Sequence, residues 1–424
     1  MSEATANGGV LSRLLPFRWI SGFQDDYERV MVHEWSPYLG AILLVVVTSA
    51  LMVSGLFWGV FGGLKLWGDY FNNFIGLGSL LGIKENLDNP LMHRISLMNI
   101  TLLLGAFAAA LFSRQFRLSR PPKLEYLWGA LGGALMGVGA ALAGGCTTGG
   151  FFTPLTFGSP TGWVMWVGLL AGAFIGLKAL LWTMEHITWG TVAPKRGPES
   201  ALKPYYPLAG LVVLAAVLYW AGSWFTSEDT KLGNRAIIVL GGFALGFILH
   251  RSRFCFSRVF REPFMTGEGT MTKAMILALA LGIPIGSLLL QHKTVDPYLA
   301  IPATFWLGSV LGGVIFGVGM VFAGGCASGS LWRVGEGHIK LMVAVFFFGW
   351  AGSIFNGIVK HWDLLSREPS LVNFNVEITK VGTQAYLPDM FGGWSWVYVL
   401  SFAILGIWYL LVRYNESTEK FTIF

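Results

Sequence analysis

Charged residues and cysteines are both scarce in this sequence. Asp, Glu, Lys and Arg make up 12% of the 424 residues, about half of the share in an ordinary soluble domain. There are three cysteines, and an odd number of thiols argues against a disulfide framework. The net charge of +6 comes from Lys and Arg that lie between apolar runs, so they form no basic face for nucleic acid. This composition is typical of a membrane protein.

Motifs for metal and cofactor binding are also missing. The seven histidines are scattered, and none is spaced from a cysteine as zinc ligands are. No Walker loop, dinucleotide fingerprint or nucleophile elbow occurs. We therefore expect no enzyme activity, no cofactor and no metal site, although three thiols that converge could bind Cu(I). The first thirty residues lack an apolar core with a small-residue cleavage site, so no cleaved signal peptide is expected.

Apolar residues are abundant, at 54% of the chain. A bilayer core about 30 Å thick needs about 20 apolar residues of helix. Runs of this kind predict an all-α integral membrane protein with about ten transmembrane helices, the sixth of them short. The runs are Pro37–Val60, Ile95–Phe112, Tyr126–Gly145, Thr161–Thr183, Tyr205–Phe225, Ala236–His250, Ala274–Gln291, Pro302–Gly325, Ile339–Lys360 and Gly393–Val412.

Basic loops predict the orientation of these helices, because cytoplasmic loops are enriched in Lys and Arg. Residues 114–123, RQFRLSRPPK, carry four basic side chains, and residues 251–273 carry five. Both loops should be cytoplasmic, and counting from either places both termini inside. The segments 64–94 and 361–392 then fall outside, where we expect short interfacial or re-entrant helices. The same count places Lys195, Arg196 and Lys203 inside, and Glu228 and Asp229 outside.

One segment is repeated in the two halves of the chain. Residues 131–149, LGGALMGVGAALAGGCTTG, align with residues 311–329, LGGVIFGVGMVFAGGCASG, with 11 of 19 positions identical. The offset is 180 residues, and loop charges send the two repeats through the membrane in opposite directions. Inverted repeats are common in transporters, where the substrate site lies between them near the bilayer midplane.

The repeat also suggests how the chain is divided. We expect a cytoplasmic segment at 1–36, a first membrane half at 37–204 and a second at 205–360. Residues 361–424 then form an external segment, a final helix and a cytoplasmic tail.

The Gly-Gly-Cys segments are the best candidates for a binding site. The glycine pairs before Cys146 and Cys326 allow a helix to end or break. Hydroxyls and amides after the break could bind an anion. The candidate residues are Gly145, Cys146, Thr147, Thr148, Gly325, Cys326 and Ser328. Alternatively, the glycines serve only close helix packing and the cysteines are small buried hydrophobes.

The third thiol, Cys255, lies in a basic segment, RSRFCFSRVFRE. Most of its arginines are explained by cytoplasmic orientation, but we expect Arg258 to attract anions to the cytoplasmic mouth. At the 180-residue offset Cys255 faces Ile75, and no cysteine lies near that position. The two repeated cysteines are therefore expected to form a symmetric core, with Cys255 as an added station on the cytoplasmic side.

The motifs AGGCTTGG, AGGCASGS and RSRFCFSRVFRE resemble those of the YeeE/YedE family of bacterial inner-membrane proteins, which have a sulfur-transport domain. The resemblance extends from about Ser54 to Lys360 and implies an hourglass-shaped protein whose waist is lined by cysteines. It also implies uptake of a small sulfur compound, thiosulfate in one branch and selenium or other sulfur species in others. The first half departs from the family pattern because it lacks a thiol paired with Cys255.

Thiosulfate is a dianion with a soft terminal sulfur, so conduction requires weak, repeated contacts. Neutral thiols can donate weak hydrogen bonds to that sulfur, and apolar burial favours the neutral form. We therefore expect a relay through Cys146, Cys326 and Cys255. The alternatives are a carrier that passes persulfide sulfur or selenium from Cys255 to a small cytoplasmic thiol-carrying protein, and a general small-anion or water channel.

Overall fold

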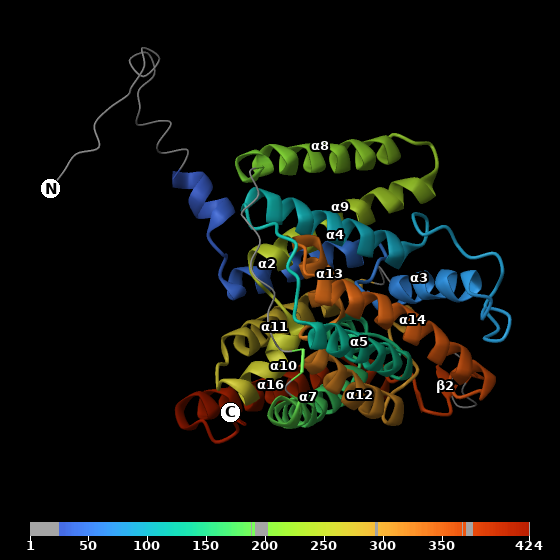
Figure 1. Cartoon of the computed structure of the whole chain (residues 1–424). Coiled ribbons are helices and arrows are strands. Elements are labelled where there is room, and N and C mark those ends of the chain that lie inside the picture. Colours follow the sequence, from blue (N-terminus) through green and yellow to red (C-terminus); the bar gives the residue numbers. More distant parts are fainter. Residues whose placement is uncertain are drawn as a thin grey trace, which may run out of the picture.

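The computed structural model describes residues 25–187, 189–190, 202–292, 296–366, 368–369 and 376–423. Nine helical segments in these ranges are long and apolar enough to cross a bilayer, or ten if the bent pair Asp25–Val32 and Pro37–Val53 counts as one span. This confirms the prediction of an all-α membrane protein with about ten spans (Figure 1). The positions of Lys195 and Arg196 lie outside the described residues.

The spans are built from both continuous and broken helices. Four contain a short additional helix: α5 (Lys123–Ala143) with η3 (Thr147–Phe152) and α6 (Thr153–Thr156), η4 (Lys203–Tyr205) with α8 (Tyr206–Phe225), α9 (Thr230–Arg251) with α10 (Phe256–Met265), and α12 (Leu307–Ala323) with α13 (Ala327–Glu336). The other five are α4 (Arg94–Phe112), α7 (Thr161–His186), α11 (Thr270–Gln291), α14 (Ile339–His361) and α16 (Ser395–Thr418). Shorter elements are η2 (Glu28–Val32), α2 (Pro37–Val53), α3 (Phe61–Phe74), η5 (Pro297–Leu299) and α15 (Leu387–Phe391).

The sixth predicted run is not short. Helix α9 spans 22 residues because it begins at Thr230, six residues before the apolar run. The Asp229 side chain accepts a hydrogen bond from the Lys231 amide at 2.8 Å, which caps the helix start. A polar first turn therefore extends this helix to the length of a full span, and a search for apolar residues alone misses it.

The two repeated helices, α5 and α12, pack against each other in opposite directions. A Cβ atom on Gly132 would lie 2.3 Å from the backbone nitrogen of Ala323, and one on Gly139 would lie 2.5 Å from that of Phe316. A position further along α5 thus meets a position earlier in α12, as two antiparallel helices require. The inverted arrangement predicted from loop charges is present in the fold.

Each repeated helix also packs on a helix of the other half. In α5, a Cβ atom on Gly133 would lie 2.2 Å from the carbonyl oxygen of Ala344 in α14. At the equivalent position of α12, one on Gly313 would lie 2.8 Å from the carbonyl oxygen of Met165 in α7. The two halves are thus interleaved through equivalent contacts, and the domain boundaries proposed from the sequence stay a prediction.

Polar contacts bring the two basic loops together at one end of the molecule, here called the basic end. Arg253 donates to the side-chain oxygen of Gln115 at 2.6 Å, and the Arg117 amide donates to the Glu336 carbonyl at 3.1 Å. Lys273 pairs with Glu416 near the C-terminus at 2.7 Å. Figure 1 shows the red C-terminal end on the left and β2 on the right.

The opposite end carries a small sheet and not only the short helices that we expected at 361–392. Strands β1 (Glu368–Pro369), β2 (Glu377–Thr379) and β3 (Gly382–Thr383) pair antiparallel in that order. The sheet is joined to the loop before α12, because Thr379 donates to the Ala303 carbonyl at 2.7 Å. The segment 64–94 begins within α3, which packs along α14 through Gly68 and Gly349.

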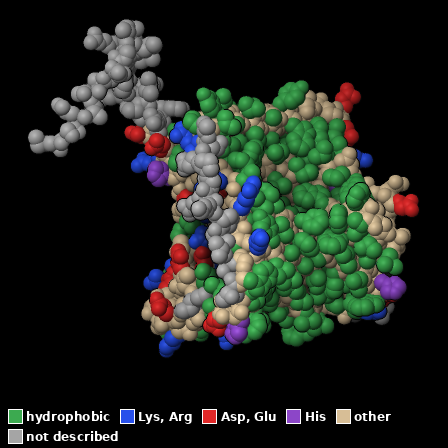
Figure 2. Space-filling model, in the orientation of Figure 1, with side chains coloured by type: hydrophobic (Ala, Val, Ile, Leu, Met, Phe, Trp, Pro, Cys, Tyr) green, Lys and Arg blue, Asp and Glu red, His purple; other side chains and the backbone are tan. Residues whose placement is uncertain are grey.

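Apolar side chains cover the outside of the helical body. Figure 2 shows a broad hydrophobic band on one face, with charged side chains gathered toward the left and right edges. Large apolar side chains that are more than half exposed include Val46, Leu208, Tyr219 and Leu410. An apolar band with charged borders is the surface that a bilayer requires.

Candidate functional site

Both repeated helices end at the first glycine of the Gly-Gly-Cys motif. Gly144 has φ 72° and Gly324 has φ 81°, left-handed values that glycine adopts without a steric penalty. Helix α13 begins directly after Cys326, and η3 begins directly after Cys146. The predicted helix breaks are confirmed, and each cysteine lies at a break inside a span.

Cys146 is fully buried and contacts the hydroxyl two residues later in the sequence. Its Sγ lies 3.0 Å from the Thr148 Oγ1. Gly145 has to be small, because a Cβ atom there would lie 2.7 Å from the backbone of Gly149 and Gly150. Thr147 is also fully buried, and its hydroxyl has no hydrogen-bond partner among the described residues.

Cys326 repeats this arrangement at the second break. Its Sγ lies 3.5 Å from the Ser328 Oγ and accepts a hydrogen bond from the Gly329 amide at 3.3 Å. A Cβ atom on Gly325 would lie 3.1 Å from the Ser330 Oγ. Each thiol is therefore paired with a hydroxyl two residues later, and both groups can donate a hydrogen bond to a bound anion.

Cys255 lies beside Cys326 and does not form a separate station. It precedes α10, and a Cβ atom on Gly329 would lie 2.6 Å from the Cys255 Sγ and 3.1 Å from the Cys326 Sγ. The two sulfur atoms thus border one small space, and they form no disulfide. Cys255 is only 1% exposed, so it is not the accessible thiol that the carrier alternative requires. The three thiols thus occupy two places, here called the first station (Cys146) and the second station (Cys255 with Cys326).

Two adjacent cavities lie between the loop before α12 and the first station. An outer cavity of about 590 Å³ lies beneath the loop before α12 and shares Phe61, Gly144, Leu299 and Ala300 with an inner cavity of about 400 Å³. The inner cavity is lined by the Gly144–Cys146 segment, and Arg94 also lines it. Because the Cys146 side chain has no exposed surface, the inner cavity ends against the segment and the thiol itself is covered.

Two phenols near the outer cavity stay neutral. Burial, and then the nearby Asp389 carboxylate, raise the pKa of Tyr298 and raise that of Tyr386 to about 12. Tyr298 lines the outer cavity and donates to Asp389 at 2.6 Å. Tyr298 thus links the wall of the outer cavity to Asp389, and neither phenol adds a negative charge.

Among the arginines near the second station, Arg258 is already paired. It forms an ion pair with Glu262 one turn later in α10. Arg261, by contrast, makes no hydrogen bond or ion pair with any described residue, and its Nε is buried. Arg261 interacts electrostatically with Cys255 and with Arg333. The unpaired positive charge near Cys255 is therefore that of Arg261. The sequence analysis placed Arg261 in the basic segment around Cys255 but did not single it out.

Arg333 is a second cation that the sequence analysis missed. It lies seven residues, or two helical turns, after Cys326, on the same face of α13. Its Nη1 donates to the Gly324 carbonyl at 3.0 Å, and its guanidinium lies 5.1 Å from the Trp332 ring. The seven-residue spacing from the cysteine was a signal in the sequence for this residue.

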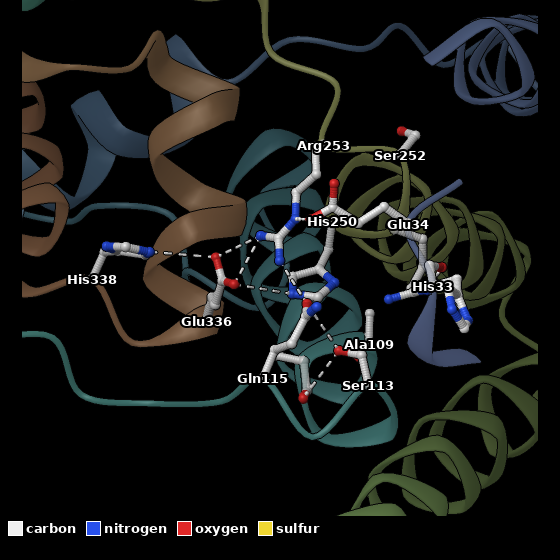
Figure 3. A network of polar contacts seen from close by, with 12 residues as sticks. His33, Glu34, Ala109, Ser113, Gln115, His250, Ser252, Arg253, Glu336 and His338 are labelled. Atoms are coloured by element: carbon white, nitrogen blue, oxygen red, sulfur yellow. Dashed lines mark hydrogen bonds and ion pairs between the residues drawn. The ribbon is translucent and has the colours of Figure 1, made fainter. Parts of the chain in front are cut away.

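A polar network at the basic end holds together the two chain segments that carry the second station (Figure 3). The Arg253 Nη1 donates to both Glu336 carboxylate oxygens, at 2.8 and 2.9 Å. Figure 3 shows His338 on one side of this carboxylate and Arg253 and His250 on the other. The nitrogen-to-oxygen distances are 3.4 Å for His338 and 3.7 Å for His250. The segment before Cys255 is thus attached to the end of the helix that starts at Cys326.

No metal site is formed among the residues that the structure describes, where no three His, Cys, Asp or Glu side chains gather as ligands. Because only two of the thiols share one space, the three-thiol Cu(I) site considered from the sequence is not formed either.

Comparison with known proteins agrees with this geometry. A family model described as Sulphur transport matches residues 21–175 and 251–423. The probable transporter YedE of Escherichia coli (strain K12) is 27% identical over 324 residues, which cover 73% of this chain and 78% of the relative. The thiosulfate transporter TsuA of the same organism is 28% identical over 179 residues, 42% of this chain and 47% of the relative. TsuA of Spirochaeta thermophila is 39% identical over 111 residues, 26% of this chain and 33% of the relative.

Proposed function

This chain belongs to the Sulphur transport family and is a multi-pass membrane transporter of sulfur compounds, and we propose that its substrate is thiosulfate. Two relatives named thiosulfate transporters support this choice. The observation that carries it is the pair of thiol–hydroxyl groups at inverted helix breaks, Cys146 with Thr148 and Cys326 with Ser328. Such groups offer weak, neutral donors to a soft dianion at two points along one path.

We infer that the anion enters from the opposite end and leaves at the basic end. The outer and inner cavities lead to Cys146 first, and Cys326 with Cys255 forms the next station. Buried neutral thiols attract the terminal sulfur weakly and so allow release, whereas several unpaired arginines would hold the dianion tightly. Arg261 and Arg333 beyond the second station then draw the anion toward the basic end.

The basic end is proposed to be cytoplasmic, which makes the direction uptake. Its loops carry most of the Lys and Arg that flank the spans, as cytoplasmic loops do. In this orientation the protein lies in a bacterial inner membrane with both termini inside. Sulfur taken up in this way could be received by a small cytoplasmic thiol-carrying protein.

The alternative role, a persulfide carrier that hands sulfur or selenium to such a partner, finds less support in the site. It requires a thiol that another protein can reach, and Cys255 is 1% exposed. Cys146 and Cys326 are fully buried. Permeation needs only that the substrate reach the thiols from within the protein, so burial favours transport.

Uptake of labelled thiosulfate by cells that express Cys146→Ala and Cys326→Ala variants tests the proposal. We expect each variant to insert normally and to lose most of its uptake, because each removes the thiol from one station. Ala110→Ser, a small change at a buried position of α4 away from the breaks, serves as the control and should retain uptake. Wild-type rates in both cysteine variants would contradict the relay.

A further inference from the structure

The first station has a structural counterpart to Cys255, and it is not Ile75. Gly149 and Gly329 are equivalent in the repeat, and Gly329 lies against the Cys255 Sγ. A Cβ atom on Gly149 would instead have the Gly59 Cα as its neighbour, at 3.8 Å. The loop between α2 and α3 therefore occupies the place of the loop between α9 and α10. The constant offset of 180 residues does not extend to this part of the chain.

The counterpart position has no side chain, and the neighbouring residue is Trp58. A Cβ atom on Gly59 would meet nothing within 4 Å, and Gly59 and Trp58 both line the inner cavity together with Cys146. The loop is held in place because Thr153 donates to the Trp58 carbonyl at 3.0 Å and Asn99 donates to the Val60 carbonyl at 2.9 Å. Where the second half offers a thiol, the first half offers a cavity beside an indole.

The indole N–H of Trp58 is an unused donor. Trp58 is 2% exposed, and its Nε1 has no hydrogen-bond acceptor among the described residues. Its ring packs against Phe152 and Phe256, with ring centroids 6.2 and 5.8 Å away, so the side chain is fixed. The buried Thr147 hydroxyl, next to Cys146, is unpartnered in the same way. Buried donors without partners cost free energy and call for an explanation.

We propose that Trp58, which lines the inner cavity, and Thr147, which follows Cys146 in the chain, form an oxyanion subsite where this cavity meets the Cys146 segment. The ligand class is a small tetrahedral oxyanion, whose oxygens accept hydrogen bonds from the indole N–H and the threonine hydroxyl. Resting on the proposed function, this assigns the sulfonate end of thiosulfate to Trp58 and Thr147 and leaves the terminal sulfur to the Cys146 thiol. Charge-assisted hydrogen bonds of this kind supply selectivity for an oxyanion over a halide.

Two variants and a spectroscopic probe test the subsite. Trp58→Phe keeps an aromatic ring and removes the N–H, and Thr147→Val keeps the shape and removes the hydroxyl. Because hydrogen bonds to charged groups are the strong ones, each variant should raise the half-saturating thiosulfate concentration, by about tenfold for Trp58→Phe. Trp166→Phe is the matched control: its indole N–H also lacks an acceptor, but Trp166 does not line either cavity, so its half-saturation should stay at the wild-type value.

The probe is the indole N–H signal of Trp58 in proton–nitrogen correlation spectra of the purified protein, assigned by its loss in Trp58→Phe. Titration with thiosulfate, and at higher concentration with sulfate, should shift this signal while that of Trp166 stays in place. An unmoved Trp58 signal, or wild-type half-saturation in both variants, would overturn the subsite. If the wild type moves no thiosulfate but sulfate still shifts the Trp58 signal, the proposed substrate fails and the oxyanion subsite stands.

Discussion

Two arginines near the second station differ in whether a carboxylate neutralises their charge. Arg258 was the arginine that the sequence favoured, yet Glu262 occupies its guanidinium. Arg261 lies three residues later and has no ion-pair partner among the described residues. A charge that is neutralised by a buried neighbour attracts a passing anion far less than a free one. The choice between them depends on contacts that only the fold reveals.

This difference predicts opposite outcomes for two similar variants. Arg261→Gln should reduce thiosulfate uptake by roughly fivefold, since it removes a charge that helps the anion leave the second station. Arg258→Gln should leave uptake nearer to wild type and lower the melting temperature, because it strands the buried Glu262 carboxylate. Uptake assays and melting curves on both variants check this, and a greater loss of uptake in Arg258→Gln would refute the assignment.

The sequence was sufficient to identify the cysteines as candidate site residues, but it did not predict that Cys255 lies beside Cys326. Identical neighbours at the 180-residue offset marked Cys146 and Cys326, because the repeat preserves local geometry. Cys255 and its counterpart Gly59 lie outside the constant offset, so their relation appears only when Gly149 and Gly329 are compared in space. The unpartnered state of Trp58 likewise depends on packing and has no signature in the chain.

Among the elements, α13 is joined to the end of α9 and the segment after it by the Glu336 carboxylate and by Trp332, whose indole donates to the Phe254 carbonyl at 3.2 Å. Glu336 closes α13 and is 8% exposed, and it receives Arg253 from the segment that leads to Cys255. Because α13 starts directly after Cys326, this contact helps to hold the segments of the two thiols side by side. The network of Figure 3 is in that sense the support of the second station.

Glu336→Gln should therefore lower both stability and transport. Breaking a mostly buried ion pair costs about 3 kcal/mol, and the melting temperature and uptake should fall together. Glu34→Gln is a control on the same arginine: Glu34 pairs with the Arg253 Nε at 2.9 Å, but its side chain is 57% exposed, so the cost should be below about 1 kcal/mol. Equal melting temperatures for the two variants would show that the buried contact does not hold the station.

Element lengths were predicted well where apolar residues reach the helix ends and poorly elsewhere. The bounds of α4 and α11 lie within a few residues of the predicted runs. Helix α9 was underestimated because its first turn is polar. The sheet at 368–383 has strands of two or three residues, too short for any periodic pattern to reveal.

The whole molecule is organised by the antiparallel contact of α5 and α12. Backbone atoms of the two helices meet at glycines in both halves, such as Gly132 and Gly312. A methyl group on Gly312 would lie 2.6 Å from the backbone nitrogen of Ala143, much as one on Gly132 approaches Ala323. Loop charges predicted the inversion correctly, whereas the closeness of this contact required the structure. The hourglass shape implied by the resemblance stays a prediction.

Alanine at the two equivalent glycines should have equal effects. Gly132→Ala and Gly312→Ala each force two backbones apart, and overpacking of this kind costs about 1–3 kcal/mol. Gly222→Ala in α8, where an added Cβ atom meets nothing within 4 Å, should be neutral or slightly stabilising. Melting curves in detergent compare the three, and a large cost at only one repeat would argue against the symmetry of the contact.

The central claim is that two thiol stations at equivalent helix breaks conduct thiosulfate through this protein. The most direct test is uptake of labelled thiosulfate into proteoliposomes that contain only the purified chain, with unlabelled sulfate as competitor. We predict saturable uptake above that of empty liposomes, with sulfate competing at least about tenfold more weakly than thiosulfate, because sulfate lacks the soft sulfur that the thiols contact. Uptake no faster than in empty liposomes, or equal competition by sulfate, would contradict the account.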